Sequence, residues 1–256
     1  MKILITGGLS GLGFSVAKCL SLKGHIVYLG VRTKKEEAYL NEKLKREKLI
    51  MFPLVLDLTT DNYTIPSDID ILYLNASIGK GGSVLELNSN YLTDTFNVNI
   101  LGNVRLIKKY LENRKKGRIV ITSSLAGFLP LPYLYSYTYT KLSLYHLANT
   151  LRLECLYQGL DISITTILPG AYYTGFNQLM IDNKDKSDFV YEAKALKMTK
   201  YQHLLFDLIE KKDLTNFAKI VSKKITKEKP PFIISIPLEQ YLFTKLYLLI
   251  NWLLFL

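Results

Sequence analysis

Tyr137 and Lys141 are the pair of side chains in this sequence best suited to proton transfer. They are four residues apart at the start of a helix-like stretch, so they share one helix face, one turn apart. An unperturbed phenol has a pKa of about 10 and is a sluggish base near neutral pH. A neighbouring ammonium stabilises the phenolate and lowers that pKa, so Tyr137 is predicted to exchange a proton with a substrate oxygen in either direction.

The spacing of this pair is not diagnostic by itself, because the chain has 18 tyrosines. The same spacing to a lysine occurs twice more, after Tyr39 and after Tyr241. The middle pair is singled out by the strand-like run just upstream, which ends in Ser123 and Ser124. A serine hydroxyl there can hold the substrate oxygen in place for the reaction. Ser124 and its nearest rival, Ser123, are the two candidates for this role.

The first thirteen residues form a phosphate-binding pattern, in which a short apolar run passes through glycines into a helix-like stretch. The first glycine permits a tight turn, the second lets the backbone approach a pyrophosphate, and the third lets the helix pack on the strand. The helix N-terminus then offers unpaired N–H groups to the anion. The residues predicted to cradle a dinucleotide here are Gly7, Leu9, Ser10, Gly11, Leu12 and Gly13.

The glycine spacing, Gly-x-x-x-Gly-x-Gly, together with the serine, tyrosine and lysine, resembles the compact single-domain branch of the short-chain dehydrogenase/reductase family. The resemblance covers residues 1–175 well and is looser beyond them. It implies that Ser124 binds the substrate oxygen beside Tyr137, the acid/base, and that Lys141 also holds the nicotinamide ribose. It implies further that Asn99, inside a helix, supports a water that links Lys141 and Tyr137 to solvent.

Two further segments resemble parts of the family's cofactor site. Pro169, Gly170 and Thr174 follow a later strand and match the segment that closes over the nicotinamide, with Thr174 placed to bond the carboxamide. Asn75 and Ala76 end the fourth strand, where small residues are needed because the cofactor ribose passes over the turn. Asn75 is expected to tie neighbouring strands together.

The end of the second strand bears on which nicotinamide cofactor is used. Val31 stands where relatives that prefer NAD carry an acid, and Arg32 follows directly. A guanidinium matches the 2′-phosphate of NADP with a bidentate fork, whereas without that phosphate Arg32 is expected to lack a partner or to point into solvent. NADP(H) is therefore predicted over NAD(H). Asp57, at the end of the third strand, either accepts from the adenine amino group, as the resemblance implies, or opens the next loop. Ser77 replaces a family glycine, so its backbone must avoid positive φ or accept strain.

Strand-like and helix-like segments alternate along the chain, which predicts a doubly wound α/β fold of the Rossmann type. Seven parallel strands are expected in one sheet with helices on both faces. The link from 58 to 69 lacks helical periodicity and is expected to be a loop. Strands are predicted at 2–6, 26–31, 51–56, 70–74, 118–122, 162–168 and 232–236. Helices are predicted at 11–23, 34–47, 89–114, 136–157, 188–210, 214–226 and 238–255.

The bulk composition fits one domain of 256 residues with a net charge of +11. Residues 1–237 are expected to form the catalytic domain and 238–256 an apolar helical tail. The two cysteines, Cys19 and Cys155, lie in apolar stretches and provide neither a disulfide framework nor a metal site. No leader segment precedes the first strand, so a cytoplasmic location is expected. The excess lysine is expected to form a solvated or membrane-facing surface, and no motif points to nucleic acid.

The tail from 238 to 256 has a narrow polar stripe, formed by Gln240, Thr244 and Asn251, and is otherwise largely apolar. Its apolar arc is wider than packing on one neighbour requires, yet the segment is short for a membrane span. Three hypotheses follow. The tail packs over the substrate pocket or the sheet, or it binds a membrane surface with help from nearby lysines, or it forms a homodimer contact.

These observations predict an oxidoreductase that interconverts a carbonyl and a secondary alcohol with NADP(H), as a reductase of a hydrophobic or acyl substrate. One alternative is a 3-oxoacyl-carrier-protein reductase, whose acidic carrier would suit the positive charge. A second is a dinucleotide-sensing or scaffold protein without turnover, which the intact serine, tyrosine and lysine argue against. The substrate itself is not indicated, because the segment from Tyr172 to about Tyr201 that should cover it has no motif.

Overall fold

The structure is a computed structural model that describes residues 1–85, 88–182 and 192–254. In these residues seven strands form one sheet in the order β3-β2-β1-β4-β5-β6-β7, and every neighbouring pair is parallel. The order reverses between β1 and β4, so successive crossovers lead to opposite faces of the sheet. The strands are β1 (Lys2–Thr6), β2 (Ile26–Val31), β3 (Phe52–Val55), β4 (Ile71–Leu74), β5 (Lys116–Thr122), β6 (Asp161–Pro169) and β7 (Ile233–Ile236).

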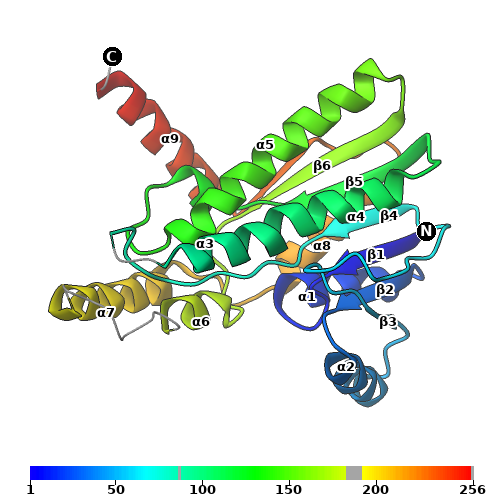
Figure 1. The fold of residues 1–256 in the computed structure, drawn as a ribbon, viewed down its shortest axis with the longest axis horizontal. Coiled ribbons are helices and arrows are strands. Elements are labelled where there is room, and N and C mark those ends of the chain that lie inside the picture. Colours follow the sequence, from blue (N-terminus) through cyan, green and yellow to red (C-terminus); the bar gives the residue numbers. More distant parts are fainter. Residues whose placement is uncertain (86–87, 183–191, 255–256) are drawn as a thin grey trace.

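Helices cover both faces of this sheet, as a doubly wound fold requires (Figure 1). One face carries α1 and α8, which pack against each other, and the other carries α4 and α5. The helices are α1 (Gly11–Ser21), α2 (Lys34–Glu47), α3 (Ser89–Phe96), α4 (Gly102–Leu111), α5 (Tyr135–Tyr157), α6 (Phe176–Asp182), α7 (Glu192–Ile209), α8 (Thr215–Ile225) and α9 (Leu238–Leu254).

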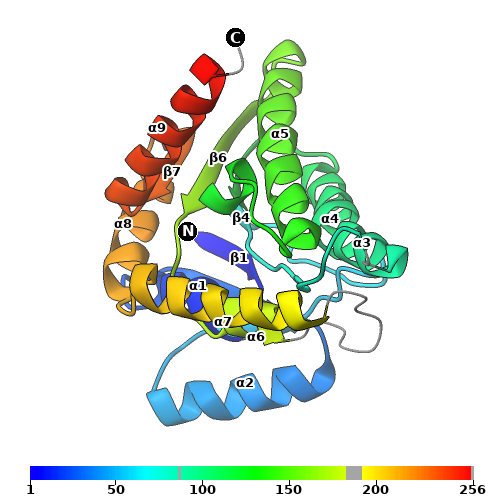
Figure 2. The same ribbon diagram turned by 90° about the vertical axis from the view of Figure 1, so that its left-hand side faces the viewer.

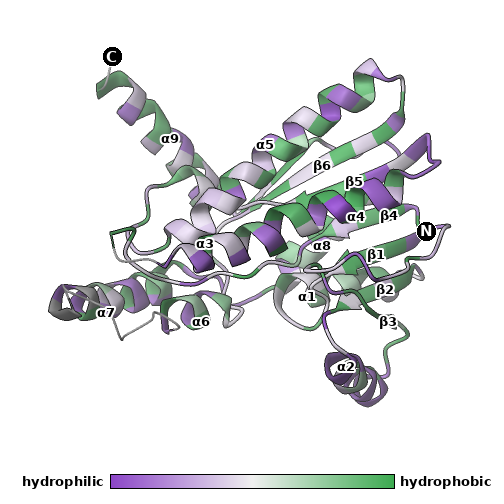
Figure 3. Cartoon of the chain, viewed as in Figure 1, coloured by the Kyte–Doolittle hydropathy of each residue, from purple (hydrophilic) through white to green (hydrophobic). Residues whose placement is uncertain are grey.

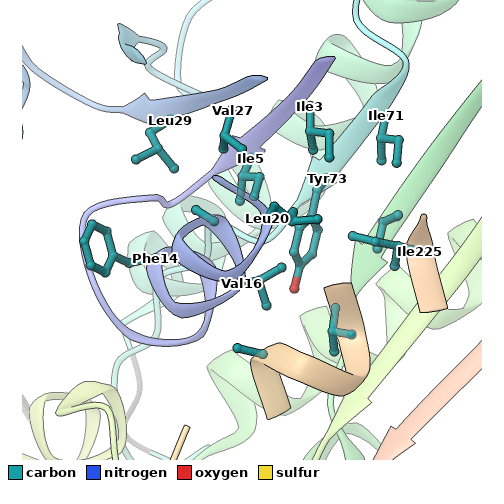
Figure 4. Packing of buried hydrophobic residues seen from close by; sticks show 14 of the residues in the cluster. Ile3, Ile5, Phe14, Val16, Leu20, Val27, Leu29, Ile71, Tyr73 and Ile225 are labelled. Atoms are coloured by element: carbon teal, nitrogen blue, oxygen red, sulfur yellow. The ribbon is translucent and has the colours of Figure 1, made fainter. Parts of the chain in front are cut away.

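The core on the α1 side is built from side chains that alternate along the central strands. Ile3 and Ile5 of β1 and Val27 and Leu29 of β2 point to the same face as Val16 of α1, and all are fully buried (Figure 4). This alternation is the two-residue period of a strand. A second core of comparable extent lies beneath α4 and α5. Because both faces are covered, the strands are nearly continuous apolar runs.

The strands and most helices agree with the sequence-based expectation to within about two residues, which confirms the Rossmann-type fold. The expected loop from 58 to 69 contains no helix. The helix expected at 89–114 is interrupted by a π-helical turn, Asn97–Leu101, between α3 and α4. One helix was not predicted, α6, and it lies in the segment expected to cover the substrate. Residues 183–191 of that segment, with the first residues of the predicted helix 188–210, lie outside the described residues.

The position of helix α9 contradicts one of the three hypotheses for the tail. It meets the domain at β7 and at the short turn Leu125–Phe128, and then extends away from the sheet (Figures 1 and 2). Packing over the pocket or the sheet is therefore wrong for most of its length, because its apolar side chains are exposed. Coloured by hydropathy, α9 is largely hydrophobic along this free portion (Figure 3). Within the described ranges, no helix has both the length and the hydropathy to cross a membrane.

Candidate active site

The glycine turn between β1 and α1 has the backbone geometry of a phosphate cradle. Gly7 has φ +66°, and a Cβ there would lie 2.8 Å from the Cα of Ala76. Gly11 has φ +59°, and its Cβ would lie 3.3 Å from Thr174 on the opposite wall. Both positions are left-handed and closely approached, so only glycine fits them without strain. The helix α1 begins here with Ser10 as its first flanking residue, which leaves backbone N–H groups facing the turn.

The carboxyl ends of β1, β4 and β5 are joined by one small network. The Thr6 hydroxyl accepts hydrogen bonds from the backbone N–H groups of Asn75 (2.9 Å) and Ala76 (3.0 Å). The Asn75 amide donates to the carbonyls of Thr6 (3.3 Å) and Gly7 (3.4 Å), and its oxygen accepts from the Thr122 hydroxyl (3.4 Å). Asn75 ties the strands together as expected, whereas Thr6 was missed. Its only signal in the sequence is a hydroxyl at the last residue of an apolar strand.

Tyr137, Ser124 and Lys141 meet at the carboxyl end of β5. The Ser124 hydroxyl and the Tyr137 phenol line the same cavity, where the hydroxyl lowers the pKa of the phenol, and the Lys141 Nζ lies 5.4 Å from the centre of the Tyr137 ring. Lys141 is buried and donates to the Thr122 carbonyl at 3.1 Å. The rival Ser123 instead donates to the Lys141 carbonyl at 2.6 Å. The geometry therefore favours Ser124 over Ser123 as the serine beside the phenol.

The electrostatics of this group differ from the expectation that Lys141 lowers the pKa of Tyr137. Burial raises the pKa of the Tyr137 phenol to about 12, against a smaller lowering by the Ser124 hydrogen bond. Burial also lowers the pKa of the Lys141 ammonium to about 7. Both shifts have one cause, since desolvation penalises whichever form is charged. In this structure burial therefore favours the uncharged forms of both Tyr137 and Lys141.

Asn99 lies in the π-helical turn and is fully buried. Its amide nitrogen donates to the carbonyl of Ile78 (2.8 Å) and the hydroxyl of Thr140 (3.0 Å), and its oxygen accepts from the Ile78 N–H (2.9 Å). The Thr140 hydroxyl in turn donates to the Tyr137 carbonyl at 2.8 Å. Asn99 thus fixes the loop after β4 to the first turns of α5. Short π-helical turns within α-helices are frequently found at functional sites.

The predicted residues line two adjoining cavities along the carboxyl edge of the sheet. One, of about 340 Å³, runs from the glycine turn to Tyr137 and Lys141, and the other, of about 710 Å³, lies beside the end of β2. Every predicted cofactor and catalytic residue lines one of these two cavities except Gly13 and Asn99, which lie behind the cavity walls. The Ser77 hydroxyl is buried between the cavities with no partner among the described residues, and its φ is not positive. An unpartnered donor beside a glycine cradle fits a dinucleotide.

The second cavity contains a carboxylate that was not anticipated, that of Glu36. It accepts a hydrogen bond from the Arg32 N–H (2.7 Å) and lies 3.6 Å from the Arg32 guanidinium. The expectation that Arg32 has no partner is therefore wrong. The signal was present, because Thr33 and Glu36 form a capping box at the start of α2, where the Thr33 hydroxyl accepts from the Glu36 N–H at 3.2 Å. Asp57 also lines this cavity, and its carboxylate accepts from the N–H and hydroxyl of Thr59 (2.9 and 2.8 Å).

The wall above Tyr137 is apolar. The Phe176 ring on α6 lies 5.3 Å from the Tyr137 ring. The side chains of Met180 and Tyr137 both lie close to Gly79 in the loop after β4. Tyr172, a candidate for substrate contact, is instead largely buried against Phe217 of α8, with ring centres 5.1 Å apart. The structure thus places a tyrosine, a serine and a lysine in a cavity that extends to the glycine turn, under a hydrophobic cover.

Comparison with known proteins decides the family. The family model described as short chain dehydrogenase matches residues 1–185. The chain belongs to this family. A 3-ketodihydrosphingosine reductase of Bacteroides thetaiotaomicron is 27% identical over 252 residues, covering 95% of this chain and 90% of that protein. Membership makes the chain an oxidoreductase of the short-chain dehydrogenase/reductase class, which acts on CH–OH and C=O groups.

Solved structures of the family share the fold. A short chain dehydrogenase/reductase from Burkholderia phymatum in complex with NAD superposes with a TM-score of 0.80 at 19% identity, covering 95% of this chain and 91% of that one. A short-chain dehydrogenase from Sphingobium yanoikuyae in complex with NADPH gives 0.71 at 22% identity, covering 93% and 88%. These neighbours share the fold of this short-chain dehydrogenase/reductase.

Gln240, the first residue of the polar stripe of α9, is fastened to the cofactor turn. Its side-chain oxygen accepts from the Ala171 N–H (2.7 Å), and its nitrogen donates to the Ile209 carbonyl at the end of α7 (2.9 Å). A Cβ on Gly170 would lie 2.0 Å from the same oxygen. The amide therefore sets the position of the turn after β6.

Replacing Gln240 by alanine should loosen this turn. The Ala171 N–H would lose its acceptor, which costs about 1–3 kcal/mol where the group stays buried. We expect the dissociation constant for NADPH, measured by its fluorescence, to rise about tenfold, a change of about 1.4 kcal/mol. Thr244→Ala is the control, since the Thr244 hydroxyl bonds only the Gln240 carbonyl within α9. A lower melting temperature with unchanged NADPH affinity would contradict a positioning role for Gln240.

The buried Lys141 ammonium should cost stability in a pH-dependent way. Its pKa falls from 10.5 to about 7 on folding, so the penalty is fully present below about pH 7 and vanishes as the pH rises through 10.5. The penalty is at most about 5 kcal/mol. Lys141→Met should therefore raise the melting temperature at about pH 6 and raise it less at about pH 10. Lys212→Met, at an exposed site, controls for net charge, and an unchanged or lower melting temperature for Lys141→Met at the acidic pH would refute the shift.

Proposed function

We propose that this short-chain dehydrogenase/reductase is an NADP(H)-dependent reductase that converts a carbonyl of a hydrophobic, lipid-like substrate to a secondary alcohol. The observation that carries the proposal is geometric: Tyr137, Ser124 and Lys141 line one cavity together with the glycine turn, and the Lys141 Nζ lies 5.4 Å from the centre of the Tyr137 ring. The Tyr137 phenol is protonated at physiological pH, as an ordinary tyrosine is, and so has a proton to donate. The reduction direction needs a protonated tyrosine, and the oxidation direction needs its phenolate.

The residues divide the chemistry among them. A bound reduced nicotinamide supplies hydride to the carbonyl carbon. The Ser124 hydroxyl holds the carbonyl oxygen, and Tyr137 donates its proton to that oxygen as negative charge develops there. Lys141 binds the cofactor's ribose hydroxyls and, when charged, stabilises the phenolate left behind. Asn99 acts through Thr140 and the loop after β4 to hold α5 in position.

The preference for NADP(H) rests on Arg32. Its side chain is 66% exposed at the mouth of the second cavity, and Val31 leaves that strand end without an acid. A guanidinium there can take the 2′-phosphate by a bidentate contact. Glu36 opposes this preference, because its carboxylate already pairs with Arg32 and would repel a phosphate. The proposal requires that Arg32 turn from Glu36 to the phosphate when NADPH binds.

A hydrophobic substrate is supported by the cover over Tyr137. Phe176 and Met180 face the phenol from α6, and Leu179 lines the same cavity. The relative from Bacteroides thetaiotaomicron is named for the reduction of a long-chain ketone. A panel of long-chain ketones, 3-oxoacyl thioesters and short polar ketones, followed by loss of NADPH absorbance, tests the substrate class. Tight NADPH binding without turnover of any of these would favour a sensor instead.

Tyr137→Phe should reduce turnover about 10²- to 10⁴-fold, the usual range for a lost general acid. NADPH affinity should stay within about threefold, because the ring and its packing are kept. Tyr139→Phe is a matched control, since its hydroxyl points to the Leu92 carbonyl at 2.6 Å and away from the cleft. Steady-state assays with the best ketone measure both variants. Retained turnover in Tyr137→Phe would refute the assignment of the acid.

Arg32→Ala should raise KM for NADPH about 10- to 100-fold and leave KM for NADH nearly unchanged, as expected for a lost charge-assisted contact. Glu36→Gln removes the competing carboxylate and should lower KM for NADPH while raising the ratio of NADPH to NADH efficiency. The two variants together separate the contribution of each side chain. If both leave the cofactor ratio of the wild type unchanged, the specificity assigned to this cavity is wrong.

A further inference from the structure

A surface helix usually packs its apolar face on the domain and exposes its polar face to water. Helix α9 does the reverse. Its least exposed positions include the polar stripe, and Thr244 is buried against the domain. Gln240 bonds the domain, and the other two members of the stripe bond within the helix: the Thr244 hydroxyl donates to the Gln240 carbonyl (2.8 Å) and the Asn251 amide to the Tyr247 carbonyl (2.9 Å). The apolar face is left on the outside. Something other than this domain must cover it.

The exposed face is broad. At 3.6 residues per turn its side chains span roughly two thirds of the helix circumference, whereas one packed neighbour needs a stripe about 100° wide. A single partner helix would leave much of it in water. We name this face the α9 surface, and its members are Leu238, Leu242, Phe243, Leu246, Leu248, Leu249, Ile250, Trp252, Leu253 and Leu254.

The charges around the α9 surface are mainly positive. Lys245 lies exposed within it, and Glu239, at the start of the helix, is paired with Lys211 at 2.7 Å. Helix α7 lies at the same end of the molecule, where the parallel strands terminate (Figures 1 and 2). Its exposed side chains mix leucines with Lys194, Lys197 and Lys200. Against these stands Asp207, the one exposed carboxylate among the side chains of α7 that the structure describes.

We propose that the α9 surface docks on a membrane containing anionic lipids, with the lysines of α7 and Lys245 contacting the headgroups. The apolar face would enter the boundary between headgroups and acyl chains, which can surround a helix over a wide arc. Lys245 would lay its stem along that boundary and its ammonium among the phosphates. Apolar insertion and basic contacts are the two signals that stable peripheral binding requires.

A second copy of this chain fits the α9 surface less well. A symmetric contact brings the same patch of both copies together, so it would set Lys245 against the same apolar face and cation of its partner. That burial would leave the ammonium without a carboxylate, because the one acid described on α9 is already paired. Anionic headgroups supply the missing negative charge. The docking inference goes beyond the proposed function and holds whether or not the substrate is a lipid.

The chain offers its own probe, because Trp252 is its single tryptophan and lies on the α9 surface, 61% exposed. Vesicles of phosphatidylcholine with phosphatidylglycerol should shift its emission to shorter wavelength and float the full-length protein. Vesicles of phosphatidylcholine alone should do so weakly, since the electrostatic contribution is then lost. Added salt should weaken binding to the anionic vesicles.

The variant L246Q/L249Q/L253Q replaces three leucines at the centre of the α9 surface and keeps Trp252. It should bind anionic vesicles at least about tenfold more weakly and lose the emission shift. The control is L153Q/L156Q/Y157Q, which replaces three exposed apolar side chains at the far end of α5 and should bind like the wild type. Wild-type protein that ignores both vesicle types, or a leucine variant that binds unchanged, overturns the proposal. So does a dimer in ultracentrifugation that L246Q/L249Q/L253Q converts to monomer while vesicles leave Trp252 unshifted.

Discussion

The site depends on one constraint: the strand order reverses between β1 and β4, so the connections that follow these two strands run to opposite faces of the sheet. Two adjacent parallel strands send their chains to opposite faces, and a crevice must open where they separate. Backbone N–H groups at that edge would lose their partners in the crevice. The Thr6 hydroxyl accepts two of them, and the Asn75 amide closes the remaining gap to β1 and β5. The glycine turn and Ser124 both follow strand ends that this network holds together.

Desolvation governs the chemistry of the crevice. Burial raises the pKa of the Tyr137 phenol and lowers that of the Lys141 ammonium, so it favours the uncharged form of both groups. The domain tolerates this cost because both faces of the sheet are fully packed. The buried Lys141 ammonium costs free energy in the empty protein. A bound dinucleotide brings its own charge to the crevice, so the lysine is better suited to the protein with its cofactor bound.

The sequence predicted the fold, and most of the residues that the structure brings together at the candidate site, because those signals are local. Apolar runs of strand length, the glycine turn and the Tyr–Lys spacing each reflect the geometry of one element. What it missed depends on contacts between elements. Gln240 reaches Ala171 from about seventy residues away, and the sign of the pKa shift at Tyr137 depends on how deeply the fold buries the phenol. Glu36 is the exception, because its contact with Arg32 spans only four residues and its spacing from Thr33 is visible in the sequence. The inward turn of the polar stripe on α9 is likewise a property of packing, since periodicity gives the width of an apolar arc but not the direction it faces.

The side-chain amide of Gln240 links the first turn of α9 to the turn after β6. One hydrogen bond holds the turn after β6, and the other holds the last residue of α7, so a displacement of the helix base displaces the wall of the dinucleotide cleft. Equilibria coupled in this way are reciprocal. If a ligand on α9 changes the affinity for dinucleotide by some factor, the dinucleotide changes the affinity for that ligand by the same factor. The tail and the catalytic crevice are then two binding sites of a single thermodynamic cycle.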